Sequence, residues 1–284
     1  MIYLLISIIA STGIFILFKL FGKYKVNVLQ AIVVNYITAC SCGILFYNGQ
    51  IRINEVVNSN WALPAFGLGF LFIAIFNVMA LTAQKNGLSV ASVASKMSVI
   101  IPVLFGILVY NESVGLQKIT GITLALIAVY LTSQKFKGES EQKTASIYLP
   151  ILLFIGSGII DTFTNHFAPS GKMELFLSII FGIAGAIGFI ILLYKSLILK
   201  DYFKLKAIPF GIILGIINYC SMYFLLKALR VDGFDSSSIF TINNVIIVAA
   251  STLIGLLLFK EPISRKNMVG ISLAILSIVL VTLA

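Results

Sequence analysis

The chain reads NESVGLQKITGITLAL at residues 111–126 and KEPISRKNMVGISLAI at residues 260–275. At an offset of 149 residues, Glu112 aligns with Glu261 and Gly121 aligns with Gly270. The residues after each glycine also align, with Ile, Leu and Ala in the same places. An internal repeat in a very apolar chain is typical of membrane transporters. The repeat therefore predicts a membrane protein built from two related halves.

The composition favours the membrane as well. The 284 residues are 60% hydrophobic and only 11% charged, with a mean hydropathy of +1.08. A soluble domain carries about 25% charged residues, so this chain has too few charges to cover a water-facing surface. We interpret the net charge of +10 as loop lysines near anionic lipid, because no basic stripe interleaved with aromatic residues indicates a nucleic-acid partner.

Ten apolar runs approach the length of about 20 residues that a spanning helix needs. They cover approximately residues 2–20, 27–47, 62–83, 89–109, 116–133, 147–166, 174–194, 207–227, 236–258 and 266–283. The longest polar stretch, residues 134–146, separates five runs from five. We predict an all-α integral membrane protein with a first five-helix repeat at 1–137, a linker at 138–146 and a second repeat at 147–284. Because each half has an odd number of spans, the two repeats would be inverted in the membrane.

The loop charges predict an orientation. Loops after odd-numbered runs hold 14 Lys and Arg residues, and loops after even-numbered runs hold five. By the positive-inside rule the odd loops are cytoplasmic and both termini lie outside.

This pattern resembles the drug/metabolite transporter superfamily, and its EamA-type members in particular. The first half carries the family's pattern at Pro102, Glu112, Gly121, Leu124 and Ala125. The second half carries it at Glu261, Gly270, Leu273 and Ala274, with Ser251 where a proline would stand. The resemblance spans essentially the whole chain. It implies a secondary transporter or exporter of small metabolites, such as amino acids, with a cavity lined by both halves. It also implies cytoplasmic termini, opposite to the orientation that the loop charges predict.

Lys96 is the most informative residue within an apolar run. It lies about eight residues into the fourth run, or about 12 Å along a helix. A lysine at that depth costs about 2.5 kcal/mol or more, so it should face a cavity or a partner. Either it binds an anionic group or takes part in proton coupling, or it forms a structural pair.

The repeat places an amide pair opposite this lysine. At the offset of 149, Ser95 aligns with Asn244 and Lys96 with Val245. We therefore expect Lys96 and the pair Asn243–Asn244 at equivalent depths, facing each other across the axis that relates the halves. The two amides can equally be hydrogen-bonding groups that hold helices together.

Asp161 is the acidic residue inside a predicted span, with Asn165 one helical turn later and His166 beside it. It is interpreted either as a proton-coupling or cation-coupling carboxylate and counter-ion of Lys96, or as a cap at a frayed helix end before Pro169. Asn35 and Asn77 complete the predicted site at its edges, although amides in spans more often serve packing. We interpret Glu112 and Glu261 as fold elements at helix N-termini. Close helix approach is expected at Gly211 and Gly215, and at Gly182, Gly185 and Gly188.

The sequence thus predicts a secondary transporter of a small metabolite in a bacterial cytoplasmic membrane. Lys96, Asn243, Asn244, Asn77, Asn35 and Asp161 form its predicted substrate site. No metal or other cofactor is expected, and the expected partners are membrane lipid, a small solute and a coupling proton or cation. No catalytic motif indicates an enzyme. A non-transporting receptor or scaffold, with Lys96 packed on Asp161, is one alternative, and a lipid-headgroup flippase is another.

Overall fold

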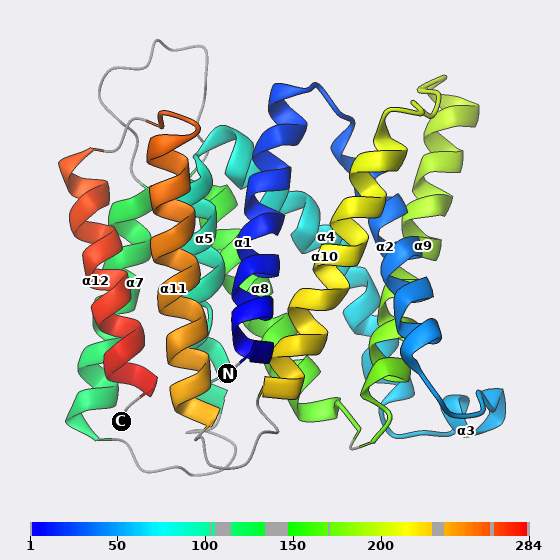
Figure 1. Cartoon of the computed structure of the whole chain (residues 1–284), viewed down its shortest axis with the longest axis horizontal. Coiled ribbons are helices and arrows are strands. Elements are labelled where there is room, and N and C mark those ends of the chain that lie inside the picture. Colours follow the sequence, from blue (N-terminus) through cyan, green and yellow to red (C-terminus); the bar gives the residue numbers. More distant parts are fainter. Residues whose placement is uncertain are drawn as a thin grey trace.

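The computed structural model describes residues 2–102, 104–105, 115–133, 147–169, 171–228, 236–261 and 264–282. This part of the chain is helical and contains no strand. Its helices, shown in Figure 1, are α1 (Ile2–Lys23), α2 (Val28–Phe46), α3 (Ile53–Val57), α4 (Ala62–Lys85), α5 (Leu88–Met97), α7 (Leu116–Ser133), α8 (Tyr148–Phe167), α9 (Met173–Ile198), α10 (Ala207–Ala228), α11 (Ser236–Leu257) and α12 (Arg265–Thr282).

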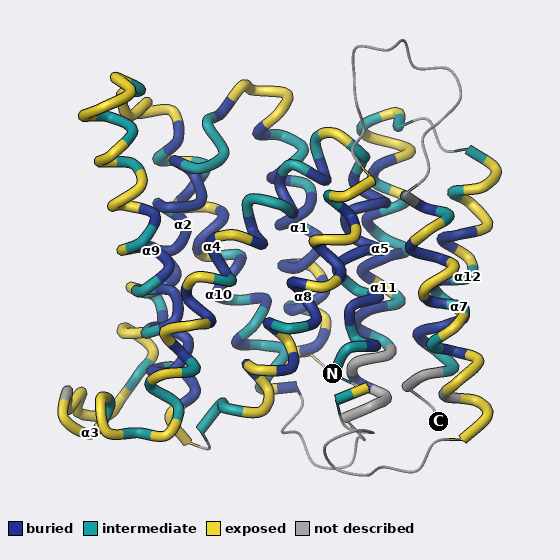
Figure 2. Tube along the Cα trace, turned by 180° about the vertical axis from the view of Figure 1, so that it is seen from behind, coloured by how far each residue is buried: buried dark blue, intermediate teal, exposed yellow. Residues whose placement is uncertain are grey.

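Each of the predicted apolar runs overlaps one of these helices, and α3 is a short addition in a loop. In the described part of the chain, α1, α2, α4, α8, α9 and α10 are long and apolar enough to cross a membrane. Shorter apolar helices cover Leu88–Pro102, Ile119–Thr132 and Ile242–Leu257. Figure 2 shows exposed residues along the outer faces of the helices, and many of them are large and apolar, such as Leu5, Ile37 and Leu253. The chain is therefore an integral membrane protein with six clear candidate spans among its described residues.

The two copies of the repeated segment pack against each other. The first copy continues into α7 and the second into α12, which lie side by side (Figure 1). The Ser277 hydroxyl donates to the Gly121 carbonyl at 2.7 Å, and the Asn267 amide donates to the Thr132 carbonyl at 3.3 Å. A methyl group added to Gly270 would lie 2.8 Å from Thr132 Cγ2. The helices are thus antiparallel, and the repeated glycine of the second copy permits their close approach.

Most of the helix contacts between the two halves of the chain have a counterpart when the halves are exchanged. Helix α1 packs on α10 and α11, and α8, at the same place in the second half, packs on α4 and α5. Helix α2 packs on α10, and its counterpart α9 packs on α4. The pairs α2–α9 and α5–α11 join counterparts directly. The two halves therefore interlock, and neither forms a separate domain with its own set of contacts.

Glycines bring α2 close to both of its neighbours. A methyl group on Gly215 of α10 would lie 2.6 Å from the Asn35 carbonyl oxygen, and one on Gly211 would lie 2.7 Å from that of Ala31. On α9, a methyl group on Gly185 would lie 3.5 Å from the backbone nitrogen of Ile37. The close helix approach predicted from these glycines is confirmed.

The predicted continuous run at 89–109 is wrong in one respect. Helix α5 ends at Met97, and residues 98 and 99 form a turn before helix resumes at Ile100. Pro102 explains the interruption, because it has no N–H to donate to the carbonyl of Ser98 and its ring crowds that carbonyl. The Ser98 carbonyl instead accepts a hydrogen bond from Ile101 N at 2.9 Å. The helix is thus broken two residues after Lys96.

Most of the basic residues gather at one end of the molecule. The connections α1–α2, α4–α5, α9–α10 and α11–α12 all lie at this end (top in Figure 1), which we call the lysine-rich end. Its described basic residues are Lys19, Lys23, Lys25, Lys85, Lys195, Lys200, Lys204, Lys206, Lys260, Arg265 and Lys266. Helix α1 begins and α12 ends at the opposite end (Figure 1).

Candidate functional site

Lys96 lies at the interruption of α5, near the centre of the molecule. Its side chain is half-buried, and the neighbours Ser95, Met97 and Ser98 are buried. The position suits a cation, because the last carbonyl groups of α5 form the negative end of its dipole. In the described part of the chain, no hydrogen bond or ion pair engages the ammonium group. An unengaged cation at a helix break is available to a ligand.

Asp161 lies within α8, six residues before its end, and not at a frayed terminus. Its side chain is exposed. Around the helix, at 100° per residue, Asp161 lies roughly 80° from the exposed Ile151, 120° from Ile155 and 160° from Phe163. Helix α8 packs on α4 and α5, and the Asp161 carboxylate contacts Ser98, which follows α5.

The two charges belong to one electrostatic unit without direct contact. Lys96 and Asp161 attract each other, but neither a hydrogen bond nor an ion pair joins them among the described residues. Ser98, two residues after Lys96, contacts the carboxylate: its hydroxyl lies 3.4 Å from Asp161 Oδ2 and also donates to the Ser95 carbonyl. A methyl group on Gly158 would lie 2.6 Å from Ile101 Cβ, so the glycine lets α8 approach the broken segment.

The amides Asn243 and Asn244 are buried in a different set of contacts. Asn243 Nδ2 donates to Asn244 Oδ1 at 3.3 Å, and Ser7 Oγ of α1 lies 3.4 Å from Asn243 Oδ1. Ser7 also donates to the carbonyl of Ser221 on α10 at 2.8 Å. No hydrogen bond between Lys96 and either asparagine occurs among the described residues. These amides join α11 to α1 in this structure, as the packing interpretation of the pair expects.

The remaining predicted amides also satisfy one another or the backbone. Asn218 Nδ2 of α10 donates to Asn35 Oδ1 of α2 at 3.2 Å. The reversed orientation of the Asn35 amide would donate to the Leu214 carbonyl of the same helix, so Asn35 bridges α2 and α10 in both. Asn77 is half-buried and donates to the Ile73 carbonyl at 2.8 Å. The structure thus brings Lys96 and Asp161 together and places the four asparagines in other contacts.

Two hydroxyl groups near the charges were not predicted from the sequence. Ser98 contacts Asp161 directly, and Ser157 lies one helical turn before Asp161 on the same face of α8. Ser157 Oγ is buried and has no hydrogen-bond partner among the described residues. Pro102, four residues after Ser98, is the signal that could have pointed to the first of them, because it predicts a break there. Ser157 has no such signal.

Of the two glutamates in the repeated segments, the structure describes Glu261, and Glu112 lies outside the described residues. Glu261 does not cap α12, the helix that follows it. Its carboxylate oxygens both lie 2.9 Å from Leu88 N at the start of α5 in the other half. Glu261 therefore contacts a helix N-terminus, as predicted, but it is the N-terminus of α5 and not that of α12.

The geometry offers a ligand two opposite charges separated by a gap. An ammonium group on one side and a carboxylate on the other can bind the carboxylate and ammonium of a zwitterion at once, with Ser98 and Ser157 as further hydrogen-bonding groups. No group of three or more His, Cys, Asp or Glu residues that could hold a metal ion is found within the described ranges.

Comparison with known proteins indicates a family for part of the chain. Residues 1–134 match the model of the EamA-like transporter family. Over these residues, which include α1, α2, α4, α5 and α7, the match confirms the family resemblance drawn from the sequence. A protein of Haemophilus influenzae (strain KW20/Rd), described as uncharacterized, is 28% identical over 276 residues, which cover 94% of this chain and 93% of that protein. A solved crystal structure matches 99% of this chain and 96% of its own with a TM-score of 0.60. At 14% identity, that likeness concerns the fold alone.

Proposed function

We propose that this protein is a secondary transporter that carries a small polar solute across the membrane by alternating access. The observation that carries the proposal is the pair of separated charges, Lys96 and Asp161, at the break in α5. Broken helices near the midplane form the binding sites of many secondary transporters. Charges inside a membrane are costly and therefore indicate a substrate or ion pathway. The EamA-like match of residues 1–134 supports the transporter class.

The architecture that we infer has ten spans in two inverted repeats, at 1–137 and 147–284. In its support, counterpart helices make the same contacts when the two halves are exchanged. The EamA match also ends at residue 134, where the polar linker begins. Rocking of one half against the other would expose the site alternately at the two ends. We place the lysine-rich end in the cytoplasm of a bacterial cell, following the loop charges.

The solute that fits this site carries both charges, as an amino acid does. Its carboxylate would contact Lys96, and its ammonium group would contact Asp161, each through charge-assisted hydrogen bonds. Asp161 is also the group that could carry a coupling proton or cation. An enzyme function has no support from the comparisons, because the family that residues 1–134 match is a transporter family.

The test is counterflow of a radiolabelled mixture of the standard amino acids in proteoliposomes. We expect the parent protein to accumulate label and Lys96→Met to lower the initial rate by about tenfold or more, since a charge-assisted hydrogen bond contributes roughly 1.5–3 kcal/mol. The matched control is Lys204→Met, because Lys204 is exposed in the α9–α10 loop. A well-folded Lys96→Met protein that transports like the control would disprove the site. A parent that moves no amino acid would disprove the solute class.

A further inference from the structure

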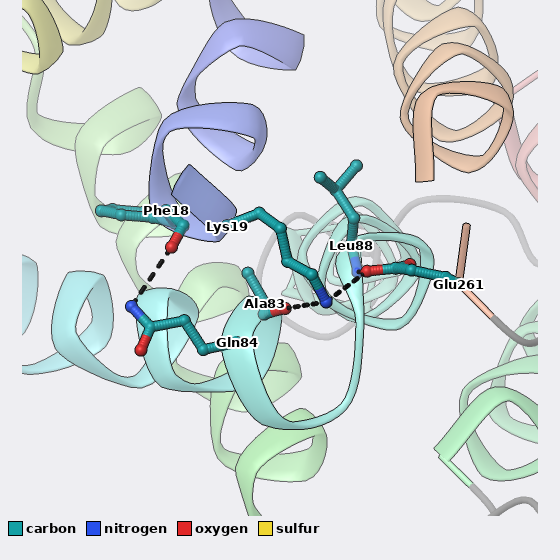
Figure 3. A network of polar contacts seen from close by, with 6 residues as sticks. All are labelled: Phe18, Lys19, Ala83, Gln84, Leu88 and Glu261. Atoms are coloured by element: carbon teal, nitrogen blue, oxygen red, sulfur yellow. Dashed lines mark hydrogen bonds and ion pairs between the residues drawn. The ribbon is translucent and has the colours of Figure 1, made fainter. Parts of the chain in front are cut away.

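At the lysine-rich end, one carboxylate from the second half contacts two residues of the first. Glu261 Oε1 forms an ion pair with Lys19 Nζ at 2.6 Å, and both carboxylate oxygens lie 2.9 Å from Leu88 N (Figure 3). Lys19 Nζ also lies 3.4 Å from the Ala83 carbonyl oxygen. The ends of α1 and α4, the start of α5 and the α11–α12 loop thus meet at one group.

The site around this carboxylate is shaped to receive it. Leu88 N is one of the first N–H groups of α5, which no carbonyl within the helix can accept, and it lies at the positive end of the helix dipole. A methyl group on Gly255 would lie 2.8 Å from Glu261 Oε2, and one on Gly87 would lie 3.0 Å from it. The backbone N–H of Glu261 donates to the Gly255 carbonyl at 3.0 Å. This hydrogen bond holds the turn after α11 that directs the Glu261 side chain towards Leu88.

The contact adds an ion pair to the packing of the second half against α1 and α5. Gln84 Nε2 of α4 donates to the Phe18 carbonyl of α1 at 3.2 Å, so the first-half residues in Figure 3 are tied to one another. Glu261 is the one residue drawn there that belongs to the second half. The side chains of Lys19 and Glu261 are only 23% and 9% exposed, so water screens their attraction less than it screens a surface pair.

Below this contact, hydroxyl groups lie buried without partners on three helices that pack together. Thr12 of α1, Ser89 of α5 and Thr252 of α11 each have a buried side-chain oxygen with no hydrogen bond among the described residues. Ser89 follows Leu88 directly, and its hydroxyl would lie 3.4 Å from a methyl group on Gly255. Burying a hydroxyl without a partner is unfavourable, but that cost vanishes in a state where water reaches it.

These hydroxyls align with the charged residues along their helices. Ser89 and Lys96 are seven residues apart on α5, which places them two turns apart on one face. Thr12 and Lys19 have the same spacing on α1. Polar residues therefore follow one face of α5 from the Glu261 contact to Lys96, and the same spacing recurs on α1.

We propose that Glu261 is the gate of the transport pathway at the lysine-rich end, and that Ser89, Thr12 and Thr252 line the closed passage between this gate and Lys96. The inference rests on the proposed function. In the structure the contacts of Glu261 with Lys19 and Leu88 hold this end closed. They break when the end opens, and water then hydrates the passage.

The experiment measures access to the passage, independently of transport. In a protein whose native residues Cys40, Cys42 and Cys220 are replaced by serine, Ser89→Cys reports on the passage, and a membrane-impermeant maleimide is added at the lysine-rich end. We expect slow labelling with Glu261 present. Glu261→Gln should raise the labelling rate by about tenfold, because the neutral amide loses the charged contacts and keeps the side-chain size.

The control cysteine is Ser277→Cys, since Ser277 is equally buried but lies between α7 and α12. Its labelling must stay slow in both backgrounds, which excludes general unfolding. Lys19→Gln should act like Glu261→Gln. If Ser89→Cys labels at the same rate with Glu261 and with Glu261→Gln, the gate is disproved. Faster labelling together with normal transport by Lys96→Met would support the gate and disprove the site.

Discussion

Replacing Gly215 by alanine tests the packing that holds α2 between α9 and α10. The new methyl group would lie 2.6 Å from the Asn35 carbonyl oxygen and 2.6 Å from Thr38 Cβ. The carbonyl belongs to the backbone of α2 and cannot rotate away. The two helices must therefore move apart, and the bond between the Asn218 and Asn35 side chains, one turn along α10, lengthens from its 3.2 Å.

The expected loss of stability follows from three terms. Overpacking of a close contact costs about 1–3 kcal/mol. Weakening of the Asn35–Asn218 hydrogen bond adds up to about 1 kcal/mol, the upper range for polar contacts between membrane helices. Alanine regains about 1 kcal/mol over glycine through its higher helix propensity. The free energy of unfolding of Gly215→Ala should therefore fall by about 0–3 kcal/mol relative to the parent, which is about 1–4 kcal/mol below a glycine-to-alanine change that gains the propensity without the clash.

The assay is equilibrium unfolding in mixed detergent micelles, with Gly67→Ala as the matched control. Gly67 lies within α4, and a methyl group there would have no atom within 4 Å. The control should be as stable as the parent, or more stable by up to about 1 kcal/mol. If Gly215→Ala is as stable as Gly67→Ala, then α2 and α10 do not pack as closely as the structure places them.

Three further predictions concern single side chains. Asp161→Asn should lower counterflow by about tenfold or more with unchanged thermal stability, because the amide oxygen keeps an acceptor but the charge is lost; a fall in stability alone would refute a binding role. Tyr36→Phe should lower the free energy of unfolding by about 1 kcal/mol, since the buried Tyr36 hydroxyl donates to the Phe72 carbonyl at 2.7 Å; an unchanged value in micelles would refute it. Lys172, and Arg52 after it, lower the pKa of Glu55, so the small stabilisation from this exposed carboxylate is present at neutral pH and lost as pH falls through its lowered pKa. The difference in melting temperature between the parent and Glu55→Gln should accordingly shrink in acid, and a difference that grows would contradict the contact.

The helices could be predicted from the sequence because apolar length decides them. A run of about 20 apolar residues has no stable state in lipid other than a helix, since every backbone group must bond within it. The break after Met97 was not predicted, although its cause, Pro102, is visible in the sequence. A proline within a span does not by itself fix where the helix opens, because neighbouring helices can accommodate the freed carbonyl.

The partners of the polar side chains could not be predicted from the sequence alone. A counter-ion role for Asp161 towards Lys96 was one of two interpretations, because a lone charge in a span is costly. It stays a prediction, since no hydrogen bond or ion pair joins the two side chains among the described residues. The asparagines carry no such constraint. Asn35 and Asn218 bond to each other although the repeat does not relate them, since α2 and α10 are not counterparts. The repeat identifies equivalent positions in the two halves, but it cannot identify contacts between helices that are not counterparts.

The contacts of the repeated glutamate could not be predicted from the repeat either. The recurrence of Glu112 and Glu261 is a property of the fold, yet Glu261 binds Lys19 and Leu88 of the other half. The Asp161 side chain, in the candidate site, is exposed. A transporter in which one end is held closed by a charged contact, while its site remains exposed, needs an open route at the other end. We therefore expect this conformation to admit solute from the end where α1 begins. If the loop charges set the orientation, that end faces away from the cytoplasm, and release would require Glu261 to leave Leu88.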